Sequence, residues 1–387
     1  MNICMVIAEF NPNMGRPPLY IANYLKRKGH KVTIITSDLD VTNKKIKKIK
    51  ELKGVKTIRL KGYFFRGKVI PSPSFFFKIA SLKSDILYLD GFEPITLLSG
   101  FAGMIRRVPI ALRADWSGRP THGLKNIYSK YIKFPVLSKS DAIMIFSEDQ
   151  KRKMIGMGIS SSKLHVVPNG VGFEQFTSKK SNYLRRLLKM PKTNKIILSV
   201  SRIRKSKNIK MAIKAFCELY KKHKNISFVN VGWVEDENYN QNLLKIIKES
   251  QLKNVHFLPE ISHTEIKKVY SSADIFVLTS DPKSEGMNLS TFEAMASGLP
   301  IVTTSVNVTS EVVKNADCGF VVNTLSALVK ALDTLLKNKK LTAKLGKNAR
   351  EEARKFSWEI ICGRVEKIIM DVYFSNKKKT SFANNFG

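Results

Sequence analysis

Short hydrophobic runs alternate with segments of helical periodicity along most of the chain. The first two runs, residues 2–8 and 31–37, are rich in β-branched residues, as expected for buried strands. Between them, Leu19, Ile21 and Leu25 follow a helical spacing that ends at a glycine. Strand, helix and strand in this order predict a βαβ unit, from which parallel sheets are built.

The alternation continues in two series, with a polar stretch at residues 189–195 between them. The first series predicts further strands at residues 85–91, 109–115, 142–147 and 164–169. The second predicts strands at residues 196–201, 226–232, 254–260, 274–280, 300–304 and 319–322, and helices at 208–223, 239–251, 263–271, 288–297 and 325–337. Two successive series predict two doubly wound, Rossmann-like α/β domains.

The domain limits follow from the same pattern. We expect an N-terminal domain over residues 1–190 and a second domain over residues 191–355. A last helical pattern follows at residues 356–375, and the polar, basic end at 376–387 is expected to be a mobile tail.

Charge is the unusual feature of the composition. The chain has 67 Lys and Arg against 31 Asp and Glu, a net charge of +36. Residues 1–190 hold 35 basic and 12 acidic side chains, which leaves +23 of this total in the first half. Such an excess is typical of proteins that bind nucleic acid, an anionic membrane or an anionic substrate, although a generally lysine-rich surface would also produce it.

The sequence also predicts the compartment. No run approaches the roughly 20 apolar residues of a membrane-spanning helix, and the start of the chain lacks a basic leader and a cleavage site. Cys4, Cys217, Cys318 and Cys362 lie far apart, without disulfide or metal spacing, and the six histidines show no ligand spacing. We therefore expect a cytoplasmic protein without a metal or other cofactor.

Two glutamates in the segment 284–302 point to ligand chemistry. Glu285 lies just before a predicted helix, and Glu293 lies eight residues on, which returns it to nearly the same helix face. Gly286 permits a close backbone approach, and a helix start offers free N–H groups that suit a diphosphate. Taken alone, the pair is equally consistent with an N-terminal carboxylate and a solvated glutamate.

Two cations follow the first strand of the second series. Arg202 comes directly after this strand, and Lys207 precedes the next helix. Ligands of such folds bind at the carboxyl ends of parallel strands, where Arg forks two phosphate oxygens and Lys supplies a point charge. Ordinary surface charges are the competing interpretation.

Together these segments resemble family 4 of the retaining nucleotide-sugar glycosyltransferases, which have two Rossmann-like domains in the GT-B arrangement, facing across a cleft. The resemblance runs nearly from end to end and includes residues 29–37, 84–91, 147–171, the Arg202 and Lys207 segment, and Glu285 to Glu293 with the sequel 297–302. The final helix resembles the family's C-terminal helix, which crosses back onto the first, acceptor-side domain.

The resemblance implies roles for individual residues. Arg202 and Lys207 would bind the donor diphosphate, with backbone N–H groups from Gly286, Met287 and Asn288. Glu285 would contact the donor sugar and act in catalysis, and Glu293 would bind the ribose.

In the first domain, residues 112–118 resemble the segment that faces the donor sugar, which assigns a catalytic role to Asp115, with Arg113 as the alternative. Many members carry two glycines after the first strand. This chain has only Gly15, followed by Arg16, so its acceptor-side loop must differ in shape.

The implied partners are a nucleotide-diphosphate sugar and a glycan or lipid-linked acceptor, used in the synthesis of cell-surface polysaccharide, glycolipid or glycoprotein glycans. The aromatic and basic stretch at residues 62–80, with Phe75, Phe76 and Phe77, suits an anionic membrane surface, although these rings could equally belong to the core. The protein would then be peripheral on the cytoplasmic membrane face.

Three other functions remain open from the sequence. A soluble transferase could act on a small molecule or a storage glucan, and a sugar-nucleotide epimerase shares the two-domain architecture. A nucleic-acid-binding protein would explain the charge, but the sequence has no helix-turn-helix, RNA-recognition or zinc signature, so we expect no nucleic-acid partner.

Overall fold

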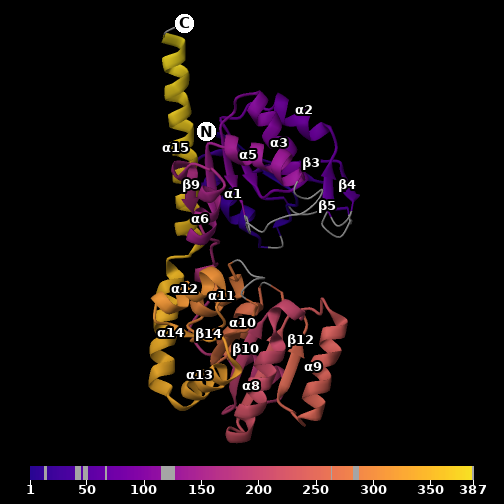
Figure 1. Ribbon diagram of the computed structural model, residues 1–387, viewed down its shortest axis with the longest axis vertical. Helices are drawn as coiled ribbons and strands as arrows, with labels where there is room; N and C mark the ends of the chain where they lie inside the picture. Colours follow the sequence, from indigo (N-terminus) through magenta and orange to yellow (C-terminus); the bar gives the residue numbers. More distant parts are fainter. Residues whose placement is uncertain are drawn as a thin grey trace. The chain divides into compact units, whose positions relative to one another are not determined.

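The computed structural model describes residues 1–12, 15–39, 45–46, 51–65, 68–114, 127–262, 264–281 and 287–385, without the side chains of residues 307 and 379–385. The chain forms two compact units (Figure 1). One consists of Met1–Asn169 together with Trp358–Gly387, and the other of Gly170–Ser357.

The first unit is built on a sheet of parallel strands in the order β3-β2-β1-β6-β7-β8-β9. Its strands are β1 (Asn2–Ile7), β2 (Lys31–Ser37), β3 (Lys56–Leu60), β6 (Ile86–Asp90), β7 (Ile110–Arg113), β8 (Ala142–Ile145) and β9 (Leu164–Val166). A separate antiparallel hairpin joins β4 (Gly62–Phe65) and β5 (Lys68–Pro71). The reversal of strand order at β1 and β6 is that of a doubly wound fold.

Helices cover both faces of this sheet. One core contains Ile21 and Leu25 of α1 with Val365 and Ile369 of α15, and the opposite core contains residues of α2, α3, α5 and α6. The helices are α1 (Pro17–Arg27), α2 (Ser74–Ser81), α3 (Pro94–Ile105), α5 (Phe134–Lys139), α6 (Glu148–Gly156) and α15 (Trp358–Asn385), with a π-helical turn at Ser129–Lys133.

The last helix, α15, is part of the first unit. It lies along α1 and continues past the other helices of this unit (Figure 1). The predicted tail from residue 376 is therefore not separate from the helix, which runs to Asn385. Lysine is a good helix former, and Lys377 lies over the ring of Tyr373 one turn earlier, so this polar segment continues the helix.

The second unit repeats the architecture with strand order β12-β11-β10-β13-β14-β15, again parallel throughout. Its strands are β10 (Lys195–Val200), β11 (Ile226–Val231), β12 (Val255–Leu258), β13 (Ile275–Leu278), β14 (Ile301–Thr303) and β15 (Gly319–Val321). Its helices are α7 (Tyr183–Leu187), α8 (Ile209–Lys222), α9 (Glu237–Glu249), α10 (Ile266–Ser272), α11 (Leu289–Ala296), α12 (Asn307–Asn315), α13 (Leu325–Lys337) and α14 (Lys339–Arg354). The two parallel sheets confirm the predicted α/β class.

The second unit begins at Gly170, before the predicted boundary at residue 190. The reason is visible at α7, where Leu184 is fully buried in the core of the second unit. The buried Arg185 donates to the carbonyl oxygens of Asn194 and Ser272 and to the carboxylate of Asp274 at 2.7 Å. The polar stretch at residues 189–195 is thus a turn inside the second unit, not a linker.

The aromatic stretch at residues 62–80 has two sides. Phe75 is 0% exposed and belongs to the core, so its predicted contact with a membrane is wrong. Phe65 and Phe77 are 61% and 68% exposed. Phe75 and Phe77 lie on different faces of helix α2. Along β4, alternation places Phe64 against the core and leaves Tyr63 and Phe65 exposed.

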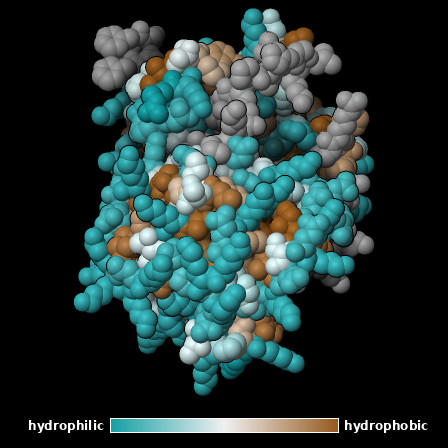
Figure 2. Space-filling view, turned by 60° about the horizontal axis from the view of Figure 1, so that its bottom comes forward, coloured by the Kyte–Doolittle hydropathy of each residue, from teal (hydrophilic) through white to brown (hydrophobic). Residues whose placement is uncertain are grey.

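The surface is strongly hydrophilic. Figure 2 shows one face on which hydrophilic residues predominate and hydrophobic residues form small, separate groups. Among the described residues, no helix is long and apolar enough to cross a membrane.

Candidate donor site in the second unit

The predicted phosphate-binding residues lie where the strand order of the second sheet reverses. The strand β10 pairs with β11 on one side and with β13 on the other. Arg202 and Lys207 follow the carboxyl end of β10, and Thr279 follows that of β13. The carboxyl edge at such a reversal is the usual ligand site of doubly wound sheets.

Hydrogen bonds hold the loop after β10 against the end of β13. The hydroxyl of Thr279 donates to the carbonyl oxygens of Lys207 and Asn208, at 3.1 and 3.0 Å. The backbone N–H of Asp281 donates to the carbonyl oxygen of Ser206 at 2.8 Å. Lys207 is only 7% exposed, so this cation is held in place by the fold and is not an ordinary surface lysine.

Arg202 has protein partners of its own. Its guanidinium is 2.6 Å from the carboxylate of Glu235, which also pairs with Arg204 at 3.2 Å. The guanidinium lies 6.0 Å from the centre of the Trp233 ring. Glu235 therefore holds two arginines at the carboxyl edge of the sheet, where a diphosphate would compete with it.

A glycine fixes the backbone beside Arg202. Gly232 has φ +153°, and a Cβ atom there would lie 2.3 Å from the carbonyl oxygen of Ser201 and 3.1 Å from the backbone nitrogen of Arg202. Real Cβ atoms do not approach backbone so closely. Only glycine allows the end of β11 to pack against the start of this loop.

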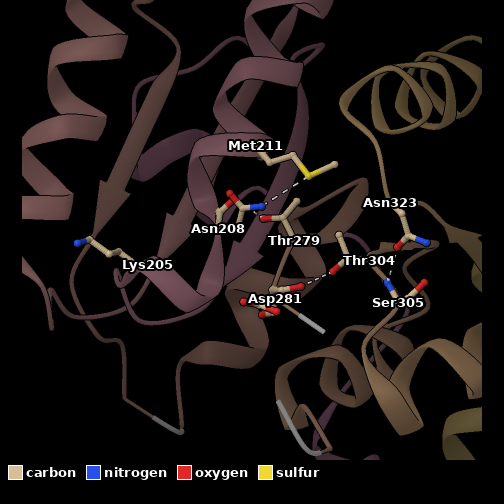
Figure 3. A pocket seen from close by; sticks show the side chains of 9 residues that line it. Lys205, Asn208, Met211, Thr279, Asp281, Thr304, Ser305 and Asn323 are labelled. Carbon is tan, nitrogen blue, oxygen red and sulfur yellow. Dashed lines mark hydrogen bonds between the residues drawn. The ribbon is translucent and has the colours of Figure 1, made fainter. Parts of the chain in front are cut away.

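A hollow of about 380 Å³ lies at the same edge of the sheet. Its lining comes from the loop after β10, the start of α8 and the ends of β13, β14 and β15 (Figure 3). Thr304 donates to the carbonyl oxygen of Ser280 at 2.6 Å, and the backbone N–H of Ser305 donates to Asn323 at 3.1 Å. Lys205 and Asn208, which belong to the predicted phosphate loop, are among the residues that line this hollow.

The start of α11 is only partly described, because Glu285 and Gly286 lie outside the described residues. Met287 packs against the core. Asn288 is the buried residue before the helix, and its side-chain oxygen accepts a 2.6 Å hydrogen bond from the hydroxyl of Ser290. Its backbone N–H points to the hydroxyl of Thr309 at 3.4 Å, a weak contact that a stronger acceptor such as phosphate could displace.

Glu293 has a partner that the sequence did not reveal. The hydroxyl of Tyr270, a fully buried residue of α10, donates to its carboxylate at 2.7 Å. Burial raises the pKa of Glu293 to about 7, although the hydrogen bond from Tyr270 works in the opposite direction. Burial, together with Glu293, raises the pKa of Tyr270 well above its ordinary value, so this hydroxyl stays a donor.

The first unit holds the remaining predicted residues. Gly15 has φ +59°, a conformation that glycine adopts easily, and it precedes α1. Arg16 pairs with the buried carboxylate of Glu9 at 2.7 Å. Asp115 lies outside the described residues.

Arg113, the alternative to Asp115, is a buried structural residue. Its guanidinium pairs with Asp90 at 3.0 Å, donates to Asn169 and lies 4.7 Å from the centre of the Phe146 ring. These three contacts hold the Arg113 side chain inside the first unit, so it is poorly suited to contact a sugar.

Sequence reasoning missed Tyr270, Glu235 and Gly232. Only Gly232 left a sequence signal, as the glycine at the end of the predicted strand 226–232. Among the described residues, no group of three or more His, Cys, Asp or Glu could hold a metal ion.

Two family profiles match the chain, one for each half. The family described as "Glycosyl transferases group 1" matches residues 182–352, and "Glycosyltransferase Family 4" matches residues 18–175. Between them, these two glycosyltransferase profiles match most of the chain.

Curated relatives are distant. The alpha-monoglucosyldiacylglycerol synthase of Acholeplasma laidlawii is 27% identical over 219 residues, which is 55% of this chain and 54% of that protein. The spore coat protein SA of Bacillus subtilis is 26% identical over 56% of this chain and 60% of its own length. The alignments thus span little more than half of these two relatives. The capsular polysaccharide biosynthesis glycosyltransferase CapM of Staphylococcus aureus is 27% identical over 70% of this chain and 72% of its length.

Solved structures share the whole fold. Sucrose-phosphate synthase from Thermosynechococcus elongatus has a TM-score of 0.74 at 19% identity and covers 97% of this chain and 99% of its own. HepE from Anabaena in complex with UDP has a TM-score of 0.76 at 17% identity, over 96% of this chain and 100% of its own. These similarities show the GT-B fold.

Proposed function

We propose that the protein transfers a sugar from a nucleotide-diphosphate sugar to a glycan or lipid-linked acceptor, with retention of configuration. The observation that carries this proposal is the loop after β10, which hydrogen bonds hold against the end of β13. It holds Arg202 and a buried Lys207 at the point where the strand order reverses, next to the end of β13. A relative that binds UDP in a solved complex has the same fold, which supports a nucleotide donor.

The chemical task of this site is to stabilise a departing diphosphate. The bond between the sugar C1 and the diphosphate oxygen breaks, and that oxygen keeps the electron pair. The acceptor hydroxyl forms the new bond to C1 and gives its proton to the departing diphosphate oxygen. Arg202 and Lys207 stabilise the negative charge as it grows. The fold already holds Lys207, whereas Arg202 exchanges its partner Glu235 for the diphosphate.

The other roles extend from this centre. Gly286, Met287 and Asn288 offer backbone N–H groups at the start of α11, and Glu293 accepts hydrogen bonds from the ribose hydroxyls. Glu285 and Asp115 contact the donor sugar in this proposal. Gly15 and Arg16 contribute to the acceptor side, where the ion pair with Glu9 sets the direction of Arg16.

A membrane-proximal acceptor is favoured by the surface of the first unit. The exposed Phe65 of β4 lies opposite Lys68 of β5, and the exposed Phe77 of α2 is followed in the chain by Lys78. Aromatic rings and lysines together suit the surface of an anionic bilayer. A relative named as a synthase of a glycolipid supports the same choice. The protein would then work as a peripheral enzyme on the cytoplasmic membrane face.

A soluble acceptor is the second candidate. It is favoured by the overall fold shared with sucrose-phosphate synthase. Release of free sugar from a panel of nucleotide sugars identifies the donor, and transfer in the presence of lipid extract or of soluble sugars separates the two acceptors. If the folded protein turns over none of the nucleotide sugars in the panel, the proposed function is contradicted.

A further inference from the structure

A second hollow, of about 320 Å³, lies at the opposite edge of the first sheet, where the strands begin. Its lining includes Lys31 at the start of β2, Lys56 at the start of β3, and Lys83, which follows α2. This edge is the reverse of the carboxyl edge, so the hollow does not belong to the acceptor-side loop with Gly15 and Arg16.

Strand register explains why these lysines meet. Asn2 lies opposite Lys31, and Thr33 lies opposite Lys56. Residues opposite each other in a parallel pair share a face, and so do residues two apart in one strand. Lys31, Thr33 and Lys56 therefore share the face of the sheet on which α2 packs. Lys83 comes from the segment that joins this helix to β6.

The three lysines have no acidic partner within the described part of the chain. No ion pair among the described residues involves Lys31, Lys56 or Lys83. The nearby carboxylate of Asp85 is occupied by the backbone N–H of Asn2 at 2.7 Å. Three cations in neighbouring positions repel one another, and an anion would relieve that repulsion.

The neighbouring helix end adds to the positive field. The last carbonyl groups of a helix normally repel an anion. Here Arg106, which follows α3, donates to the carbonyl oxygen of Leu82 at 2.7 Å and to that of Ile79 at 3.4 Å. The end of α2 is thus capped by a cation on the side where Leu82 and Lys83 line the hollow.

We infer that this hollow binds a phosphate group through Lys31, Lys56 and Lys83. A phosphate monoester carries about two negative charges at neutral pH, and the phosphodiester of a lipid headgroup carries one. Both offer several acceptor oxygens that three lysines can share. The hydroxyl of Thr33 lines the same hollow and can donate to a phosphate oxygen, whereas the side-chain amide of Asn2, which also lines it, points to Asp85 at 3.5 Å. Cys4 and Leu82, which also line the hollow, are apolar and fit the carbon part of a phosphate ester, either a lipid headgroup or a soluble phosphorylated compound.

Binding of inorganic phosphate, measured by calorimetry, tests this site. The titrations use the Arg202→Gln, Lys207→Gln background, so that the proposed donor site does not contribute. The added triple change Lys31→Gln, Lys56→Gln, Lys83→Gln should weaken binding at least tenfold. The matched triple Lys221→Gln, Lys253→Gln, Lys330→Gln removes the same charge from exposed sites on the second unit and should change binding less than twofold.

A second variant tests whether phosphate binding needs the hollow itself and not only the charge of the three lysines. Thr33→Tyr keeps every lysine but fills the hollow, and it should also weaken phosphate binding tenfold. Circular dichroism checks that it folds, and if it does not, the lysine triple decides. Absence of phosphate binding by the parent, equal binding by the two lysine triples, or full binding by folded Thr33→Tyr overturns the inference.

Vesicles distinguish the two sources of phosphate. Sedimentation with phosphatidylglycerol and phosphatidylcholine vesicles compares the two lysine triples in the otherwise native chain. If only the Lys31, Lys56 and Lys83 triple variant loses binding to phosphatidylglycerol vesicles, the site binds a lipid headgroup. Equal vesicle binding by both triples, with the phosphate result intact, assigns it to a soluble phosphate ester. Donor hydrolysis should persist in both triples, since neither touches the proposed donor site.

Discussion

Glu293 shows how a buried carboxylate can weaken the free protein. Its pKa is raised from 4.5 to about 7 by burial. As pH rises from 4.5 to 7, the unfolded chain loses this proton while the folded chain keeps it, so folding stability falls over this range and stays lower above it. A shift of this size corresponds to at most about 3 kcal/mol.

We therefore predict that Glu293→Gln stabilises the free protein at pH 8 and has little effect at pH 4.5. Glutamine keeps an oxygen that can accept from Tyr270, but it never ionises. Thermal unfolding of both proteins from pH 4.5 to 8 measures the difference. A melting-temperature difference that does not change with pH would show that the raised pKa is not the cause. Donor turnover should fall because the proposed ribose contact is weakened.

Gly232 is the second residue whose role depends on backbone geometry. Gly232→Ala would force a Cβ atom to 2.3 Å from the carbonyl oxygen of Ser201, so the start of the Arg202 loop must move. We expect a loss of roughly 1–3 kcal/mol in stability and at least a tenfold loss in donor hydrolysis.

Gly158→Ala is the matched control for this change. Gly158 has φ +87° with no heavy atom within 4 Å of an added Cβ, so the control carries backbone strain of about 1 kcal/mol without a clash. Its hydrolysis should stay near the parent rate. Equal hydrolysis by the two variants would remove the argument that Gly232 positions the loop.

At the scale of elements, regular hydrophobic runs were the predictable part of the fold. The strands β1, β2, β6 and the six strands of the second sheet all lie in short, mainly apolar stretches. The edge strand β3 alternates apolar residues with Lys56 and Arg59, and the hairpin strands β4 and β5 are only four residues long. Such short or alternating segments give too little signal to separate a strand from a loop.

Residues of the candidate site could be predicted from the sequence where they directly follow a strand. Arg202 and Lys207, which lie after β10, are of this kind. Tyr270 could not be found in this way, because its contact with Glu293 joins two helices, α10 and α11. The same holds for Glu235, which follows a different strand from the arginines that it binds. Tertiary pairing of this kind has no local sequence signal.

Helix α15 is the element whose packing can be tested most directly. Ile369 is fully buried against the first sheet, whereas Phe374 is 51% exposed on the same helix. We predict that Ile369→Ala destabilises the first unit by about 2–4 kcal/mol through a lost core contact and a cavity. Phe374→Ala should cost less than about 0.5 kcal/mol. Denaturant unfolding measures both, and equal effects would contradict the packing of α15 in this core.

At the scale of the whole molecule, charge and exposed aromatic residues combine on the first unit. Residues 1–169 and 358–387, which form this unit, hold 35 basic and 14 acidic side chains, a net charge of +21. Each lysine close to an anionic bilayer contributes about 1 kcal/mol, and salt screens this attraction over about 8–10 Å. If charge alone attracted the protein to the bilayer, high salt would abolish the binding. If the aromatic rings also inserted into the bilayer, part of the binding would remain at high salt.

The last prediction separates these two contributions. We expect the protein to sediment with phosphatidylglycerol vesicles at low salt and to retain a part of this binding at 0.5 M salt, on the order of a tenth or more. Phe65→Ser with Phe77→Ser should remove the salt-resistant part and leave the low-salt part, because it changes no charge. Ile105→Ser is a matched control, since this residue is also exposed but lies at the end of α3, outside the aromatic stretch. If the double variant and the control bind alike at both salt concentrations, the aromatic stretch has no part in membrane contact, and a soluble acceptor becomes the better proposal.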